Sequence, residues 1–189
     1  PTKVPYQTSG KFASSTDPET WDTWDNLIKQ VPEPNQEKGL GIVFEDTANI
    51  IGVDFDHCVE DGVLHPDVAS FVKSAKTYVE YSPSGTGIHL LFEKTEAIEL
   101  IANKHHFDTY SVEIYTSGRY FTFTGNELEE SKEVLPISSD VLALLLESLG
   151  YPWKKEEPVE IATAQQPTLL EDEELLRKMF ASRHGAKLQ

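Results

Sequence analysis

The sequence predicts an α+β domain built around a mainly antiparallel sheet. Short apolar runs of strand length recur in pairs, and a short polar stretch separates the two members of each pair. Segments with apolar residues at helical spacing lie between the pairs. Strand pairs that alternate with helices in this way are typical of α+β proteins. The 189 residues contain no internal repeat.

The first predicted helix covers residues 18–31. Asp17 is a good N-cap for it, and the proline that follows suits the first turn. Trp21, Trp24 and Ile28 recur at helical spacing. We therefore expect both tryptophans to anchor the core rather than to stack on nucleic-acid bases.

Three strand pairs are expected after a loop at residues 32–39. Each pair is interpreted as two neighbouring strands joined by a turn. The pairs are residues 40–44 with 49–56, residues 77–81 with 87–93, and residues 111–115 with 119–125.

Three more helices are expected in the same domain, at residues 66–76, 94–103 and 138–149. The first has an apolar side made of Val68, Phe71, Val72 and Ala75. The last follows a serine that can cap it. Residues 1–150 are therefore interpreted as one domain. Residues 151–168 lack periodicity and read as a linker, and residues 169–189 read as the start of a truncated helical domain.

Composition limits the classes to which the protein can belong. No apolar run approaches the length of a membrane span, and the N-terminus has no signal-peptide pattern. The single cysteine, Cys58, excludes an internal disulfide and fits a reducing cytoplasm.

The net charge of −16 is unusual for a protein that handles nucleic acid. Residues 1–150 contain 25 Asp and Glu against 10 Lys and Arg, so the acidity belongs to the domain itself. Such a surface repels a phosphate backbone. Two interpretations of the acidic surface stay open. It serves solubility alone, or the domain holds a polynucleotide weakly, through metal ions and a few cations.

Three carboxylates stand in apolar strand-like runs. Asp54 and Asp56 are two residues apart, so on a strand they project to the same face. Glu113 lies between two apolar residues. Clustered carboxylates need cationic partners, and their oxygen ligands suit Mg²⁺ or Mn²⁺. The alternatives are a solvated strand end for the aspartates and an exposed edge-strand position for the glutamate.

The turn in SPSGTGIH is suited to binding an anion. Gly85 and Gly87 allow a tight turn with exposed N–H groups, and Ser84 and Thr86 add hydroxyl donors. His89, on the strand that follows, can donate a hydrogen bond to a phosphate oxygen. The same residues are also ordinary turn formers, so a plain hairpin is the alternative.

Arg119 is the single arginine within residues 1–150, and its guanidinium group matches phosphate in shape and charge. A surface arginine with no binding role is the alternative. No function is assigned to His57 with Cys58, or to His105 with His106, which lie in an expected loop.

Together, in this order, these motifs resemble those of the archaeo-eukaryotic primase superfamily, and most closely the primase-polymerase domains of phage and plasmid primase-helicase proteins. The resemblance covers about residues 10–150. It is carried by Val53–Asp56, Ser82–His89 and Val112–Tyr115, and by the strand GRYFTFTG at residues 118–125.

The resemblance implies a catalytic domain in which an α/β module joins an RRM-like antiparallel module. It implies that Asp54, Asp56 and Glu113 are catalytic and hold two Mg²⁺ or Mn²⁺ ions. His89, Arg119 and the turn at residues 84–87 would bind the incoming nucleotide. The implied partners are single-stranded DNA template, primer and (d)NTP, with a helicase domain in the full-length protein, and this fragment is expected to be monomeric.

The expected function is therefore template-directed DNA polymerase or primase activity. Two alternatives stay open. One is a non-catalytic module that binds nucleotide or DNA within a replication complex. The other is a metal-dependent phosphatase or glycosyltransferase built around the paired aspartates, although His57 and Cys58 after Asp56 depart from the phosphatase pattern.

Overall fold

The computed structural model describes residues 4–30, 39–100, 102–129 and 131–153. The chain divides into two units, residues 1–155 and residues 156–189, and the described residues all belong to the first. The predicted helix at residues 169–183 and nearly all of the predicted linker lie outside the described residues. No described helix combines the length and the apolar character that a membrane crossing requires.

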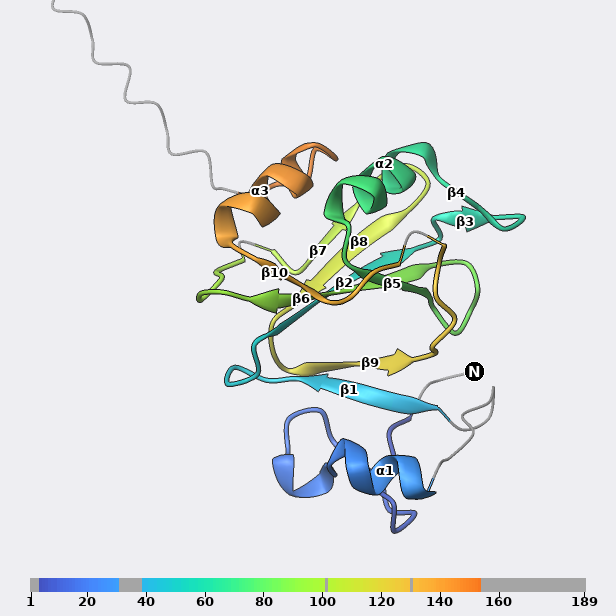
Figure 1. The fold of residues 1–189 in the computed structure, drawn as a ribbon, viewed down its shortest axis with the longest axis vertical. Helices are drawn as coiled ribbons and strands as arrows, with labels where there is room; N and C mark the ends of the chain where they lie inside the picture. Colours follow the sequence, from blue (N-terminus) through green and yellow to red (C-terminus); the bar gives the residue numbers. More distant parts are fainter. Residues whose placement is uncertain (1–3, 31–38, 101, 130, 154–189) are drawn as a thin grey trace, which may run out of the picture. The chain divides into compact units, whose positions relative to one another are not determined.

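A six-stranded sheet forms the centre of the first unit (Figure 1). Five of its strands follow one another across the sheet in the order β10 (Leu135–Ile137), β6 (Ile88–Lys94), β2 (Ile50–Asp56), β8 (Ser111–Tyr115) and β7 (Lys104–His106). The sixth, β5 (Tyr78–Tyr81), pairs with the first part of β6, and β10 pairs with the last part. All pairs except β10 with β6 are antiparallel.

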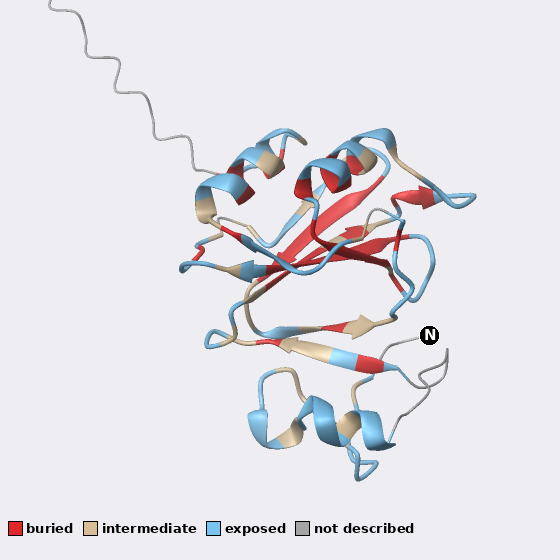
Figure 2. Ribbon diagram, viewed as in Figure 1, coloured by how far each residue is buried: buried red, intermediate tan, exposed pale blue. Residues whose placement is uncertain are grey.

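Two helices, α2 (Pro66–Ala75) and α3 (Ser139–Glu147), cover one face of this sheet (Figure 1). The central strands are buried almost throughout, as Figure 2 shows. On the helix side the core is filled by alternate strand residues, among them Val53, Phe55, Leu90 and Ile114. The predicted apolar side of α2 is entirely buried, and Ser138 caps α3 through its side chain, so both predictions are confirmed.

The opposite face packs on a separate two-stranded sheet, β1 (Leu40–Phe44) with β9 (Arg119–Phe123). A small, mainly aromatic hydrophobic cluster fills the space between the two sheets: Phe44, Tyr78, Leu91, Tyr115 and Phe121. Gly52 makes this close approach possible, because a Cβ atom there would lie 2.4 Å from the ring atoms of Phe44 and Phe121. A 3₁₀ turn (Pro18–Thr20) precedes α1 (Trp24–Gln30), and α1 contacts this layer through the ring pair of Trp24 and Phe123.

The strand pairing corrects two of the three predicted pairs. Strands β5 and β6 pair as expected, but β1 does not pair with β2, nor β8 with β9. Instead β1 and β9 pair with each other. The reason is burial: β2 and β8 are largely buried on both faces and lie inside the larger sheet, whereas β1 and β9 have exposed positions and form the outer layer.

Other local predictions were also wrong. Residues 94–100 form no helix, because Lys94 ends β6 and the chain continues to the short strand β7, which contains His105 and His106. Trp24 is 56% exposed rather than buried. The α+β class is confirmed, with antiparallel sheets and, among the described residues, three α-helices and a small hairpin of β3 (Val59–Glu60) and β4 (Val63–Leu64).

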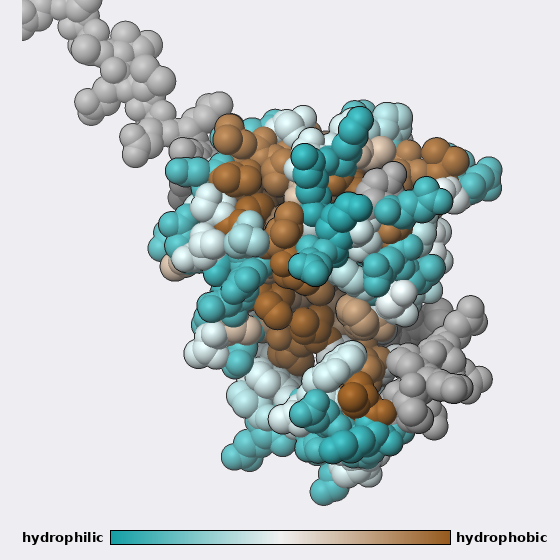
Figure 3. All heavy atoms as spheres, viewed as in Figure 1, coloured by the Kyte–Doolittle hydropathy of each residue, from teal (hydrophilic) through white to brown (hydrophobic). Residues whose placement is uncertain are grey.

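Apolar side chains gather on part of the surface near α3. Val141 and Leu144 of α3 are 50% and 67% exposed, and Val134 and Leu135 lie exposed just before the helix. Figure 3 shows brown apolar atoms that extend from this helix toward the β1–β9 layer.

Candidate functional site

A row of five polar residues crosses the central sheet, one from each of five adjacent strands. Asp54 on β2 lies opposite His89 on one side and opposite Glu113 on the other. Beyond them, Glu80 lies opposite His89, and Lys104 lies opposite Glu113. Directly opposed residues of neighbouring strands project to the same face, so the whole row faces the β1–β9 layer.

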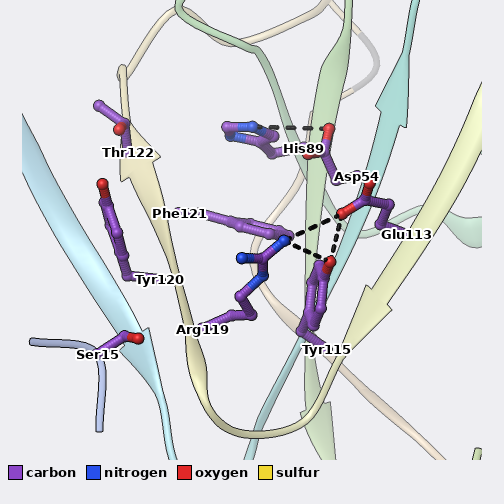
Figure 4. Close-up of a pocket in the computed structure, with 9 residues that line it drawn as sticks. All are labelled: Ser15, Asp54, His89, Glu113, Tyr115, Arg119, Tyr120, Phe121 and Thr122. Carbon is purple, nitrogen blue, oxygen red and sulfur yellow. Dashed lines mark hydrogen bonds and ion pairs between the residues drawn. The ribbon is translucent and has the colours of Figure 1, made fainter. Parts of the chain in front are cut away.

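A pocket opens between this row and strand β9 (Figure 4). Its lining comprises Ser15, Asp54, His89, Glu113, Tyr115, Arg119, Tyr120, Phe121 and Thr122. Four of the predicted site residues therefore meet at one place, namely Asp54, His89, Glu113 and Arg119. They come from four different strands, so only the folded chain brings them together.

His89 is held from three sides. Its side chain is only 4% exposed, and the ring stacks on Phe121 with ring centroids 4.6 Å apart. Its Nδ1 lies 3.2 Å from Oε1 of Glu80. Its Nε2 lies 3.8 Å from Oδ1 of Asp54. Nε2 is therefore the ring nitrogen on the side of the aspartate.

Glu113 is surrounded by hydrogen-bond donors. Nζ of Lys104 donates to one carboxylate oxygen, and the hydroxyl of Tyr115 donates to the other. Nη2 of Arg119 lies 3.7 Å from the same carboxylate and donates to the Tyr115 hydroxyl at 3.0 Å. Burial alone would raise the pKa of Glu113, but the hydrogen bonds from Lys104 and Tyr115 outweigh it and leave the pKa below its ordinary value.

Asp56 and the glycine-rich turn lie beside the pocket rather than in its lining. Asp56 is opposite Ser111, one step along the same face from Asp54. The turn packs against the end of β2, where a Cβ atom on Gly87 would lie 2.4 Å from the carbonyl oxygen of Phe55. The backbone N–H of Val59 also donates to the carbonyl of Thr86. The turn and Asp56 are thus neighbours at one end of the site.

Asp54, Asp56 and Glu113 are the predicted metal-binding set. Among the described residues, no three Asp, Glu, His or Cys side chains converge as a metal site. Asp54, Asp56 and Glu113 nevertheless share one face of two paired strands, and their oxygen atoms suit Mg²⁺ or Mn²⁺. The donor set therefore fits such an ion in chemistry and register. Coordination by Glu113 would require its carboxylate to exchange the hydrogen bond from Lys104.

Three contributors to the site were missed in the sequence. Glu80 and Tyr115 lie in the predicted strands, and Glu80 carried the same signal as Glu113, an acid within an apolar run. Tyr115 is two residues from Glu113 and so shares its face. Lys104 had no signal, because β7 was interpreted as the end of a helix and a loop.

Comparison with known proteins finds a clear relative. No family model matches the chain. The chain is similar to the DNA primase-polymerase of Nitratiruptor phage NrS-1, with 32% identity over 182 aligned residues. The alignment covers 94% of this chain and 24% of the phage protein. The chain thus spans about a quarter of the relative's length.

Proposed function

Since the chain is a homologue of a DNA primase-polymerase, we propose that it is a template-directed nucleotidyltransferase, which adds (d)NTPs to a 3′-hydroxyl group on single-stranded DNA. The observation that carries this proposal is the pairing of Asp54 with Glu113 and with His89 across β2, in one pocket with Arg119. We also propose the two-module architecture of the archaeo-eukaryotic primases for residues 1–150.

Asp54, Asp56 and Glu113 would hold two Mg²⁺ or Mn²⁺ ions in this mechanism. When bound, such ions activate the attacking hydroxyl group and neutralise charge on the transferring phosphate. The chain's own role is to place the carboxylates on one rigid face of paired strands. Rigid placement matters because catalysis of phosphoryl transfer depends mainly on positioning and on charge stabilisation.

Arg119 and His89 would bind the triphosphate of the incoming nucleotide. The side chain of Arg119 is 58% exposed and lines the pocket, so a ligand there can reach it. His89 directs Nε2 toward Asp54 at the inner end of the pocket. The turn at residues 84–87, next to Asp56, would add backbone N–H donors for the phosphates.

Template would be held weakly by this domain. Its acidic residues greatly outnumber its basic ones, so counterion release supplies little affinity for DNA. We propose that other parts of the longer protein, a helicase domain among them, contribute to holding the template.

A second candidate is a module that binds nucleotide or DNA without catalysis. One observation favours it: the Glu113 carboxylate is paired with Lys104 and Tyr115 rather than gathered with the aspartates. The candidates differ in what they predict for turnover, because a binding module would bind (d)NTP and extend no primer.

An extension assay separates these functions. The chain is incubated with primed and unprimed single-stranded DNA, with dNTPs or NTPs, and with Mg²⁺ or Mn²⁺. We expect extension of the primed strand that stops when EDTA is added. Nucleotide binding without extension on any primed template would support the binding module instead. Phosphate release that needs no template would support a phosphatase.

A further inference from the structure

Glu80 is a fully buried acid that the proposed mechanism does not use. It lies on β5 at the end of the polar row, and only 2% of its surface is exposed. Its carboxylate accepts hydrogen bonds from the Tyr78 hydroxyl at 2.9 Å, from the backbone N–H of Gly125 at 2.8 Å, and from the backbone N–H of Thr124 at 3.0 Å. The fourth neighbour is Nδ1 of His89 at 3.2 Å.

These contacts place a proton on Nδ1 of His89. Burial alone would raise the pKa of Glu80, but the hydrogen bonds from His89, Gly125, Tyr78 and Thr124 outweigh burial and lower it. Independently of His89, the backbone N–H of Thr124 donates to both carboxylate oxygens and that of Gly125 donates to Oε2, so the group is an ionised carboxylate that can only accept. Nδ1 of His89 must then be the donor, which leaves Nε2 on the side of Asp54.

Glu80 also holds the strand that carries the other phosphate-binding candidate. Thr124 and Gly125 directly follow β9, which contains Arg119 at its start and Phe121 in its middle. Phe121 stacks on the ring of His89 with an interplanar angle of 23°. The imidazole is thus fixed in its plane by Phe121 and in its rotation by Glu80.

We propose that Glu80 is a positioning residue: it accepts from Nδ1–H of His89 and so turns Nε2 toward the phosphate of the bound nucleotide. Nε2 donates to a phosphate oxygen there, with the ring protonated on both nitrogens. This inference rests on the proposed function for the identity of the ligand, whereas the protonation of Nδ1 of His89 is measured without any ligand. Glu80 does not touch the substrate in this proposal, so its effect on binding passes through His89.

The experiment compares four variants of the 189-residue chain. Glu80→Gln removes the charge while keeping the shape, and His89→Ala removes the proposed target. The double variant combines them. Tyr78→Phe is the matched control, because it removes a different hydrogen bond to the same carboxylate. Binding of dATP in the presence of Mg²⁺ is measured by calorimetry. The protonation of both ring nitrogens of His89 is read from a long-range ¹H–¹⁵N spectrum of the unmodified chain.

We expect a proton on Nδ1 of His89. We also expect Glu80→Gln to weaken dATP binding by about tenfold, and Tyr78→Phe to change it by less than about twofold. In the His89→Ala background, Glu80→Gln should add less than about twofold. A bare Nδ1, or an equal effect of Glu80→Gln in both backgrounds, would overturn the proposal.

The spectrum of the unmodified chain decides the matter even if Glu80→Gln does not fold. Failure of the proposed function looks different: the unmodified chain would then bind no dATP and extend no primer, whatever the protonation of His89.

Discussion

Asp54 and Glu113 lie directly opposite one another on β2 and β8, and their side chains project to the same face of the sheet. His89 occupies the corresponding position on the other side of Asp54. An acidic pair of this kind is costly in an otherwise apolar sheet unless cations compensate it. Lys104 and Arg119 lie next to Glu113, and the proposed metal ions would complete the compensation.

Asp54→Asn should reduce primer extension by about 100-fold or more, because it removes a charge that the transferring phosphate and its metal ions require. Asp56→Asn should have a similar effect. The rate is measured on a primed template with Mg²⁺ and again with Mn²⁺. Asp46→Asn, in the exposed turn after β1, is the control and should be unchanged. Near-normal extension by Asp54→Asn would exclude the assigned role.

Arg119→Ala should raise the apparent KM for dATP roughly tenfold, since it removes a charged donor to phosphate. The turnover number should change less. Steady-state extension at varied dATP concentration separates the two. Lys11→Ala, at an exposed position, controls for loss of positive charge alone. An unchanged KM in Arg119→Ala would count against phosphate binding.

Lys104→Met should tighten Mn²⁺ binding by roughly fivefold, because the ammonium group that now pairs with Glu113 competes with a metal ion for the carboxylate. Free Mn²⁺ is measured by electron paramagnetic resonance, so the result does not depend on activity. Lys11→Met should leave the affinity unchanged. If Lys104→Met binds Mn²⁺ no better than the unmodified chain, Glu113 is not a ligand.

Glu80 should make the fold sensitive to acid. Its pKa is lowered in the folded chain, so its charge stabilises the fold above the ordinary value of 4.5. That contribution is lost as the pH falls below 4.5 and through the lower folded-state pKa. Urea unfolding should therefore show a stability gap between the unmodified chain and Glu80→Gln that is widest near neutral pH and narrows in acid. A gap independent of pH would contradict an ionised Glu80.

Gly52→Ala should destabilise the fold by about 2 kcal/mol, because the new methyl group would meet the buried rings of Phe44 and Phe121 at 2.4 Å. Gly41→Ala is the matched control on β1, where the nearest atom lies at 3.3 Å on the less buried ring of Tyr120. It should cost less than about 1 kcal/mol. Thermal unfolding measures both. Equal stability of the two variants would mean that the layers separate easily at Gly52.

Local sequence patterns predicted much of the fold. The apolar side and length of α2 and the serine cap of α3 were correct, since both depend on residues within a few positions of each other. The helix expected at residues 94–103 failed because backbone groups at its two ends bond to distant segments: the N–H of Thr95 donates to Ile137, and the carbonyl of Asn103 accepts from Ile114. Trp24 showed helical periodicity, but α1 lies outside the core and leaves it exposed.

The sequence by itself determined which residues are candidates for the chemistry: which carboxylates stand in strands, which turn is rich in glycine, and where the domain's single arginine lies. It determined that Asp54 and Asp56 share a face, because side chains alternate along a strand. Only the tertiary structure decided which strands pair. Pairing depends on which distant segments bury their side chains against one another. Local periodicity carries no information about which strand is the neighbour of which. That choice placed Glu113 and His89 on either side of Asp54, and added Glu80 and Lys104 to the row.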